Sequence, residues 1–131
     1  MKLIIAAVAD HAWVENGCLT ICRTFDTINA PEFPYKIPRI SIGVRILVGR
    51  SEYGAHALTI LLRDAEGNKL INAKTDINVL PPPNDLPETS FSIAVNGQNI
   101  EFKHTGDYQV VILTDDVEMA NIPIYVRTMK T

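Results

Sequence analysis

The sequence predicts an all-β fold, a two-sheet antiparallel β-sandwich with about eight strands and little helix. The first observation is a period of two between residues 39 and 48, which is typical of a strand with one buried and one wet face. The apolar positions of this run are Ile40, Ile42, Val44, Ile46 and Val48. The second is that residues 58–62, 91–95 and 122–126 repeat the alternation. The third is the lack of any long segment with helical spacing and caps. Strands that are apolar on one face need a second sheet to cover it.

Composition and charge narrow the functional classes. The 131 residues, 47% of them apolar, predict a single domain over residues 1–131. The net charge is −3 and the basic residues are scattered, which argues against a nucleic-acid partner and an anionic membrane surface. The longest apolar run, residues 3–9, is far shorter than the roughly 20 residues that span a bilayer. We interpret it as the first strand, because a signal peptide normally takes about 15–30 residues.

Turn residues divide the first part of the chain. Residues 2–14 are expected to form a strand, with a break near Asp10 left open, and residues 15–17 a turn into a partner strand over 18–25. Three prolines then predict an extended crossing loop over residues 29–38, since proline lacks the N–H that a central strand needs. In this loop Phe33 and Tyr35 are expected to pack over a sheet edge.

The second part of the chain reads the same way. Strands are expected over 56–63 and 69–79, joined by a turn that begins at Asp64, and a stiff proline-rich connector over 81–87. Residues 89–96 form the next strand, after which Asn96-Gly97 is either a tight hairpin turn or part of one bent strand. The last expected strands are 108–114 and 119–127.

The two cysteines predict a reducing compartment. Cys18 and Cys22 lie four residues apart on one expected strand, so their Cα atoms would be ~13 Å apart. A disulfide needs less than about 7 Å, so these two residues cannot bridge each other. Free thiols favour the cytoplasm, and we expect both residues to serve as small buried apolar side chains.

Several segments together carry a family resemblance. They are residues 9–21, Phe25-Asp26-Thr27-Ile28, Phe33-Pro34, Ile37-Pro38-Arg39, residues 106–110 and Ile122-Pro123-Ile124. The pattern resembles a family of small uncharacterised bacterial proteins, a domain family of unknown function. The resemblance implies a β-sandwich and no assigned activity, and it transfers no functional residues. The step Gly106-Asp107-Tyr108 also resembles the tyrosine corner of immunoglobulin-like sandwiches, in which a tyrosine hydroxyl bonds to nearby backbone.

Candidate chemistry is sparse. Asp10 and His11, with Glu15 nearby, form the densest cluster of catalytic residue types, but a polar strand end or bulge is the favoured explanation. The three histidines, His11, His56 and His104, fall in separate segments, and no spacing requires a zinc site. Acidic turn residues are a candidate Ca²⁺ site, but Asp suits turns in any case. We expect no catalytic residues, no metal ligands and no cofactor.

Apolar positions on outer faces indicate an interface. Residues 110–113 are apolar on both faces, so Val111 and Leu113 need a cover, either the 29–38 loop or a partner subunit. Leu47 and Leu61 break otherwise polar faces in the same way. The first hypothesis is therefore a non-catalytic binding module, self-associating or bound to another protein, that uses a sheet face or edge. The alternative is a small-ligand or metal-dependent enzyme or carrier that uses Asp10 and His11 with another histidine.

Overall fold

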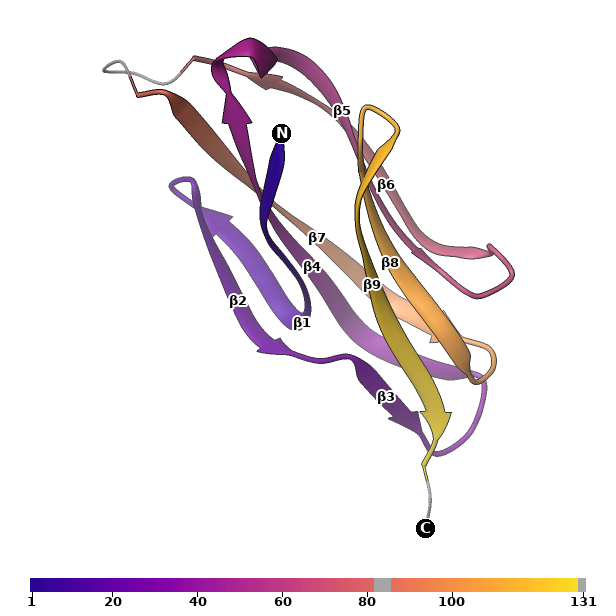
Figure 1. The fold of residues 1–131 in the computed structure, drawn as a ribbon. Helices are drawn as coiled ribbons and strands as arrows, with labels where there is room; N and C mark the ends of the chain where they lie inside the picture. Colours follow the sequence, from indigo (N-terminus) through magenta and orange to yellow (C-terminus); the bar gives the residue numbers. More distant parts are fainter. Residues whose placement is uncertain (82–85, 130–131) are drawn as a thin grey trace.

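Strands make up nearly all of the chain (Figure 1). The computed structural model describes residues 1–81 and 86–129, and in this part of the chain nine strands form two sheets. The strands are β1 Lys2–Glu15, β2 Cys18–Thr24, β3 Thr27–Ala30, β4 Tyr35–Gly49, β5 Gly54–Arg63, β6 Lys69–Val79, β7 Glu88–Phe102, β8 Gly106–Thr114 and β9 Val117–Thr128. The first sheet has the order β2-β1-β4-β7 and the second β3-β9-β8-β5-β6. A 3-10 turn over Arg50–Glu52 is the helical segment of the described residues, and it is too short to cross a membrane.

The sheets pack face to face on a common core, so the predicted sandwich is confirmed. One buried cluster joins Ile42, Val44 and Ile46 of β4 to Ile60 of β5 and Ile112 of β8. The alternation over residues 39–48 places its apolar members inward, and each of them is at most 1% exposed. Strand pairing is antiparallel except between β3 and β9, which run parallel. That pair departs from the purely antiparallel sandwich that the sequence predicts.

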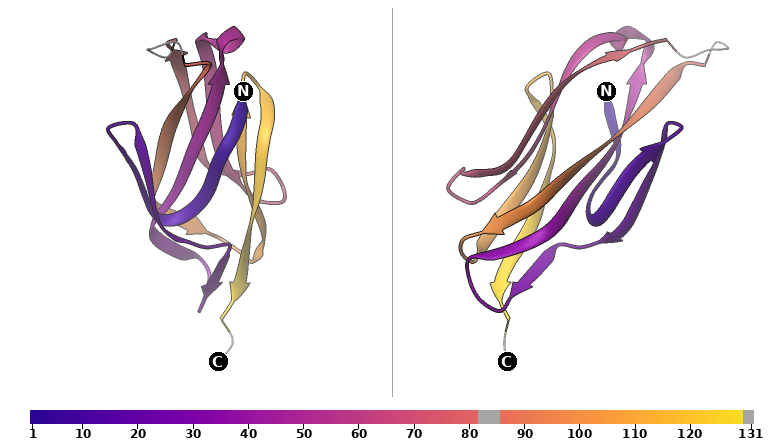
Figure 2. Two further views of the ribbon diagram at one scale, coloured as in Figure 1. Left: turned by 60° about the vertical axis from the view of Figure 1, so that its left-hand side comes forward. Right: turned by 180° about the vertical axis from the view of Figure 1, so that it is seen from behind.

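The first strand changes partner halfway along. Residues 2–9 of β1 pair with β4, whereas residues 9–15 pair with β2, and Ala9 takes part in both ladders. The strand is therefore continuous, without the break considered near Asp10. Its second half and β2 form a hairpin, here called the hairpin arm (residues 10–24), on the outer side of β4 and β7 (Figure 2).

The hairpin arm covers the outer face of the first sheet. A Cβ atom added at Gly43 in β4 would lie 3.0 Å from Ile21 Cγ1 and 3.3 Å from Leu19 Cδ1, so both side chains of the arm rest on this glycine. Arg45, also in β4, donates to the backbone oxygen of Gly17 in the turn of the arm at 3.1 Å. Ser41, expected on the wet face, is fully buried as a consequence.

The prediction of a loop over residues 29–38 is wrong at both ends. Residues 27–30 form β3, and β4 begins at Tyr35, so Pro38 lies inside a strand. A proline is tolerated there because β1 pairs with β4 only from Ser41 onward, leaving this part of β4 with β7 as its one neighbour. Phe33 and Tyr35 are both partly buried against the core, Tyr35 as the first residue of β4.

The residues around Gly97 do not turn. β7 is one strand over Glu88–Phe102 and pairs with β4 along its whole length, so the hairpin prediction at Asn96-Gly97 is wrong. The glycine serves packing instead, since a Cβ atom at Gly97 would lie 2.7 Å from Ile71 Cδ1 of β6. Gly97 thus gives room for a side chain from the other sheet. The proline-rich connector predicted over 81–87 lies largely in residues 82–85, outside the described residues.

Two local predictions in the second sheet are confirmed. The Asp64 carboxylate accepts hydrogen bonds from the backbone N–H groups of Glu66 and Asn68, each at 2.9 Å, and so closes the β5–β6 turn. The Tyr108 hydroxyl donates to the backbone oxygen of His104 at 2.9 Å, which is the bond expected of a tyrosine corner. The ring of Tyr108 is 2% exposed and stacks edge-to-face on Phe102.

Candidate functional site

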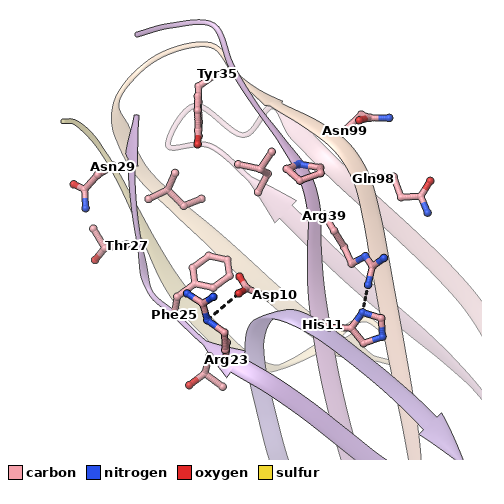
Figure 3. A pocket seen from close by; sticks show the side chains of 14 residues that line it. Asp10, His11, Arg23, Phe25, Thr27, Asn29, Tyr35, Arg39, Gln98 and Asn99 are labelled. Carbon is pink, nitrogen blue, oxygen red and sulfur yellow. Dashed lines mark hydrogen bonds and ion pairs between the residues drawn. The ribbon is translucent and has the colours of Figure 1, made fainter. Parts of the chain in front are cut away.

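An open cleft of about 900 Å³ lies at the base of the hairpin arm (Figure 3). It forms where the arm separates from the first sheet, and its lining comes from β1, β2, β3, the start of β4 and the C-terminal part of β7. Asp10 and His11 line it, as does the chain that leads from Thr24 to Asn29. The cleft therefore collects residues that are distant in sequence but are brought together by strand pairing.

Asp10 faces a cation across the arm. Its carboxylate accepts from Arg23 Nε at 3.1 Å, with the Arg23 side chain 86% exposed. Arg23 has a φ of 59°, in the left-handed region that residues other than glycine, asparagine and aspartate seldom adopt. This backbone turns the chain out of β2 toward Phe25, whose N–H donates to the Val8 backbone oxygen at 3.1 Å.

His11 contacts a second arginine. Arg39 Nη1 donates to His11 Nδ1, and because arginine is only a donor, this nitrogen of the imidazole acts as the acceptor. The His11 ring also packs edge-on to Trp13, with a centroid distance of 4.8 Å. Figure 3 shows the Asp10–Arg23 and His11–Arg39 pairs toward one end of the cleft and Tyr35 at the other.

The third member of the predicted cluster lies elsewhere. Glu15 pairs with Cys18 at the tip of the hairpin arm and does not line the cleft. Cys18 and Cys22 are free thiols, as expected, but both are exposed, so the prediction of buried small residues is wrong. They lie on the face of the arm opposite to Leu19 and Ile21, because successive side chains of a strand point to opposite sides.

The three histidines do not converge. His56 Nδ1 lies 2.6 Å from Asp115 Oδ2, and this hydrogen bond raises the pKa of His56 and lowers that of Asp115. His104 lies 3.9 Å from the Asp64 carboxylate, whose pKa is lowered chiefly by its hydrogen bond with the Asn68 side chain. Over residues 1–81 and 86–129, no three metal-ligating side chains group together.

The four candidate interface residues differ in exposure. Leu61 and Val111 stand opposite each other on β5 and β8 and are only 7% and 2% exposed within the single chain. Leu47 and Leu113 are half-buried. Next to Leu61 and Val111, Arg63 Nη2 donates to Gln109 Oε1 at 3.2 Å. Long polar side chains therefore share the outer face of the second sheet with the apolar ones. Little of Leu61 and Val111 is left for a partner to contact.

The edge of the first sheet is the second candidate region. β7 pairs with β4 on one side, and no strand of the described residues pairs with its other side. From Thr89 to Ile100 this edge strand carries neither a charged residue nor a proline. The edge strand of the second sheet, β6, carries Lys69, Lys74 and Asp76. Between these two edges lies a groove of about 620 Å³, lined partly by Ile77, Val79, Phe91 and Ile93.

Sequence reasoning missed the two arginines of the cleft. Arg23 and Arg39 each stand alone in the sequence, so no local motif marks them. They meet Asp10 and His11 only because β1 pairs with β2 on one side and with β4 on the other. The alternation into residue 39 places Arg39 on a polar face, and this is the one signal that the sequence offers.

Residues 4–127 match a family described as a family of unknown function, DUF6941, and the chain therefore belongs to that family. The predicted resemblance to an uncharacterised domain family is confirmed. No curated protein matches the chain.

Proposed function

We propose that this member of the DUF6941 family is a non-catalytic interaction module that binds another polypeptide by adding a strand along β7. A second copy of the chain is the partner to which we commit. The observation that carries the proposal is the long uncharged edge from Thr89 to Ile100. An edge strand presents unpaired backbone N–H and C=O groups, and proteins normally guard such edges with charges, prolines or short strands.

The other edges of the sandwich have this protection. β6 carries two lysines and an aspartate, β2 has seven residues and ends near the left-handed Arg23, and β3 has four residues. β7 has 15 residues, and from Thr89 to Gln98 it carries no charge, no proline and no left-handed residue; Asn99, with a φ of 52°, follows this run. The contrast within one molecule supports selection for pairing at β7.

A second copy fits this edge on electrostatic grounds. In an antiparallel pair of two β7 strands centred near Val95, the central residues that face each other are all neutral. A β6–β6 pair centred near Lys74 would instead bring like charges together. The groove beside Phe91 and Ile93 adds apolar pockets for side chains of an incoming strand, which is how strand-addition sites gain specificity.

The finer fold and setting are also proposals. An immunoglobulin-like arrangement is supported by the tyrosine corner at Tyr108, by the parallel β3–β9 pair and by the two-sheet strand order. The hairpin arm is then an insertion between the first half of β1, which pairs in the first sheet, and β3, which pairs in the second. Exposed free Cys18 and Cys22 support a reducing, cytoplasmic setting, and the family resemblance supports a bacterial one.

The decisive experiment measures solution mass by light scattering across a concentration series for the wild type, A94K and N72K. Ala94 lies in the centre of the uncharged run, and Asn72 is an exposed residue of β6, so the two variants add the same charge to the two edges. We expect a concentration-dependent dimer that A94K weakens at least about tenfold in Kd and that N72K leaves intact. Circular dichroism of each variant checks that it is folded.

Two further measurements decide between partners and surfaces. A synthetic peptide of residues 88–102 should bind the wild type but not A94K, whereas a peptide of residues 69–79 should not bind. A dimer that L113K disrupts while A94K does not would assign association to the outer face of the second sheet and overturn the proposal. A monomer that takes up neither peptide would also overturn it.

A further inference from the structure

We propose that the cleft at the base of the hairpin arm binds a small organic carboxylate that also carries an apolar or aromatic group. This binding site is separate from the β7 edge pairing and does not depend on it. It rests on four kinds of group in one cleft: two guanidinium groups, a histidine, three neutral amides, and apolar walls from Phe25 and Tyr35. A volume of about 900 Å³ lies within the range of roughly 300–1,000 Å³ that is usual for small-molecule sites.

The charge of the cleft opposes that of the chain. The protein carries a net charge of −3, yet the charged residues of the lining are Arg23, Arg39 and the single acid Asp10. That acid is already paired with Arg23. An anion entering the cleft therefore meets one unneutralised guanidinium, on Arg39, without facing an unpaired carboxylate.

Most donors of the two arginines lack a protein acceptor. A guanidinium group has five N–H donors in a planar fork that matches a carboxylate. Arg23 uses Nε for Asp10, and Arg39 uses Nη1 for His11, and no other side-chain bond of either residue occurs within residues 1–81 and 86–129. The fork of Arg39 opposite to its His11 contact is free for a bidentate oxyanion. The Asp10–Arg23 pair shows the same chemistry inside the cleft.

Neutral amides line the wall beside the arginines. Gln98 and Asn99 come from β7 and Asn29 from β3, and all three are exposed. Their side chains have no hydrogen-bond partner in the described part of the chain. Asn99 also has a φ of 52°, so two left-handed residues, Arg23 and Asn99, line one cleft. Backbone in this region tends to be retained at ligand sites, where it directs a side chain or an amide toward the ligand.

Apolar groups make the other part of the lining. Phe25, Tyr35 and Ile37 are all half-buried, with one side against the core and another toward the cleft. Figure 3 shows the Phe25 ring beside the Asp10–Arg23 pair and the Tyr35 ring away from both arginine pairs, so a ligand that spans the cleft meets charged groups at one end and aromatic rings along its length. This arrangement favours an aromatic or branched carboxylate over inorganic phosphate, which has no apolar part.

The test is NMR titration of the full chain with benzoate, phthalate, inorganic phosphate and the neutral isostere benzamide. We expect benzoate and phthalate to shift the Nε–H signals of Arg23 and Arg39 and the backbone amides of Gln98 and Asn99. Benzamide should leave them in place. The R23Q/R39Q variant should bind the carboxylates at least about tenfold more weakly, because the charge-assisted contact with Arg39 and the remaining donors of Arg23 are lost.

The control is K69Q/K74Q, which removes the same charge from β6 on the other sheet. It should bind as the wild type does, and its spectrum reports folding, as does that of R23Q/R39Q. Equal weakening in both variants would mean non-specific attraction and would overturn the proposal. Shifts with phosphate alone, equal shifts with benzamide, or no shift with either carboxylate at millimolar concentration would overturn it too.

Discussion

The two sheets protect the same kind of surface in different ways. The outer face of the first sheet is covered by a separate piece of chain, the hairpin arm, which contacts Gly43 with two apolar side chains. Among residues 1–81 and 86–129, no hairpin of this kind lies on the outer face of the second sheet, and Leu61 and Val111 are buried beside the Arg63–Gln109 pair of their own sheet. Apolar residues on an outer face therefore do not by themselves mark an interface.

The sheets also differ in how their turns and edges are held. Carboxylates hold two turns of the second sheet: Asp64 accepts from backbone N–H groups within the β5–β6 turn, and Asp115 links the β8–β9 turn to β5 by accepting from Ala57 N at 2.9 Å. The second sheet also has the charged edge strand. The first sheet relies on apolar contact and has the uncharged edge. We expect the first sheet to be sensitive to volume and the second to be sensitive to pH.

The largest expected effect is on the covered face of the first sheet. G43A places a methyl group 3.0 Å from Ile21 Cγ1, closer than side chains normally pack, so the arm must shift. Overpacking of this kind should lower the free energy of unfolding by about 1–3 kcal/mol. Urea titration of the wild type and G43A measures this difference. The G43A/I21A double variant should be less destabilised than the two single changes added together, because the clash disappears with the Ile21 side chain.

A glycine of the second sheet provides the matched control. A Cβ atom at Gly106 would meet Tyr108 Cε1 at 3.6 Å, an ordinary contact distance. G106A should therefore change stability by no more than about 0.5 kcal/mol. If G43A and G106A were equally mild, or if G43A and I21A were strictly additive, the arm would not rest on the sheet as described.

The sequence predicts the core well because the alternation of apolar and polar residues within each strand identifies its buried face. The alternation from Ile40 to Val48 depends on neighbouring residues only, and all five apolar positions are buried. The same local logic finds the Asp64 turn and the Tyr108 hydrogen bond. Ser41 shows the limit of this logic: its burial depends on an arm that no local pattern directs onto the sheet.

The cleft is only half predictable for the same reason. Asp10 and His11 are adjacent, so the sequence alone shows two catalytic residue types side by side, and both line the cleft. Arg23 and Arg39 reach it through two different strand pairings, which depend on register and not on spacing. The sequence leaves two alternatives at Gly97, a turn and a continuous strand, because a glycine that makes room for Ile71 has the same sequence signature as one that bends the chain.

A smaller effect is expected at the corner of the second sheet. Y108F keeps the ring on Phe102 but removes the hydroxyl that donates to the His104 backbone oxygen. The loss should be about 0.5–1.5 kcal/mol in unfolding free energy, the usual net worth of one hydrogen bond. Y125F is the control, because Tyr125 is an exposed residue of β9 on the same sheet. Equal effects of the two changes would show that the corner bond adds nothing to stability.

The smallest expected effect is the pH dependence of one ion pair in the second sheet, His56 with Asp115. The hydrogen bond with Asp115 raises the pKa of His56 above 6.5, so its contribution is complete below pH 6.5 and is lost as the pH rises through the folded-state value. The same bond lowers the pKa of Asp115 below 3.8, so that contribution is present above pH 3.8 and is lost as the pH falls through its folded value. The pair therefore stabilises most between these limits.

Thermal unfolding of the wild type and H56Q from pH 4 to 9 measures this contribution. The stability difference between the two proteins should be largest near pH 5–6 and should shrink above pH 7, because the wild type then loses its charged imidazole. D64N is the matched comparison: the low pKa of Asp64 comes first from the Asn68 side chain, so its effect should stay constant from pH 5 to 9. If the stability difference between the wild type and H56Q were also independent of pH, His56 would be neutral when bonded to Asp115. The charge of the imidazole would then contribute nothing to the stability of the second sheet at this turn.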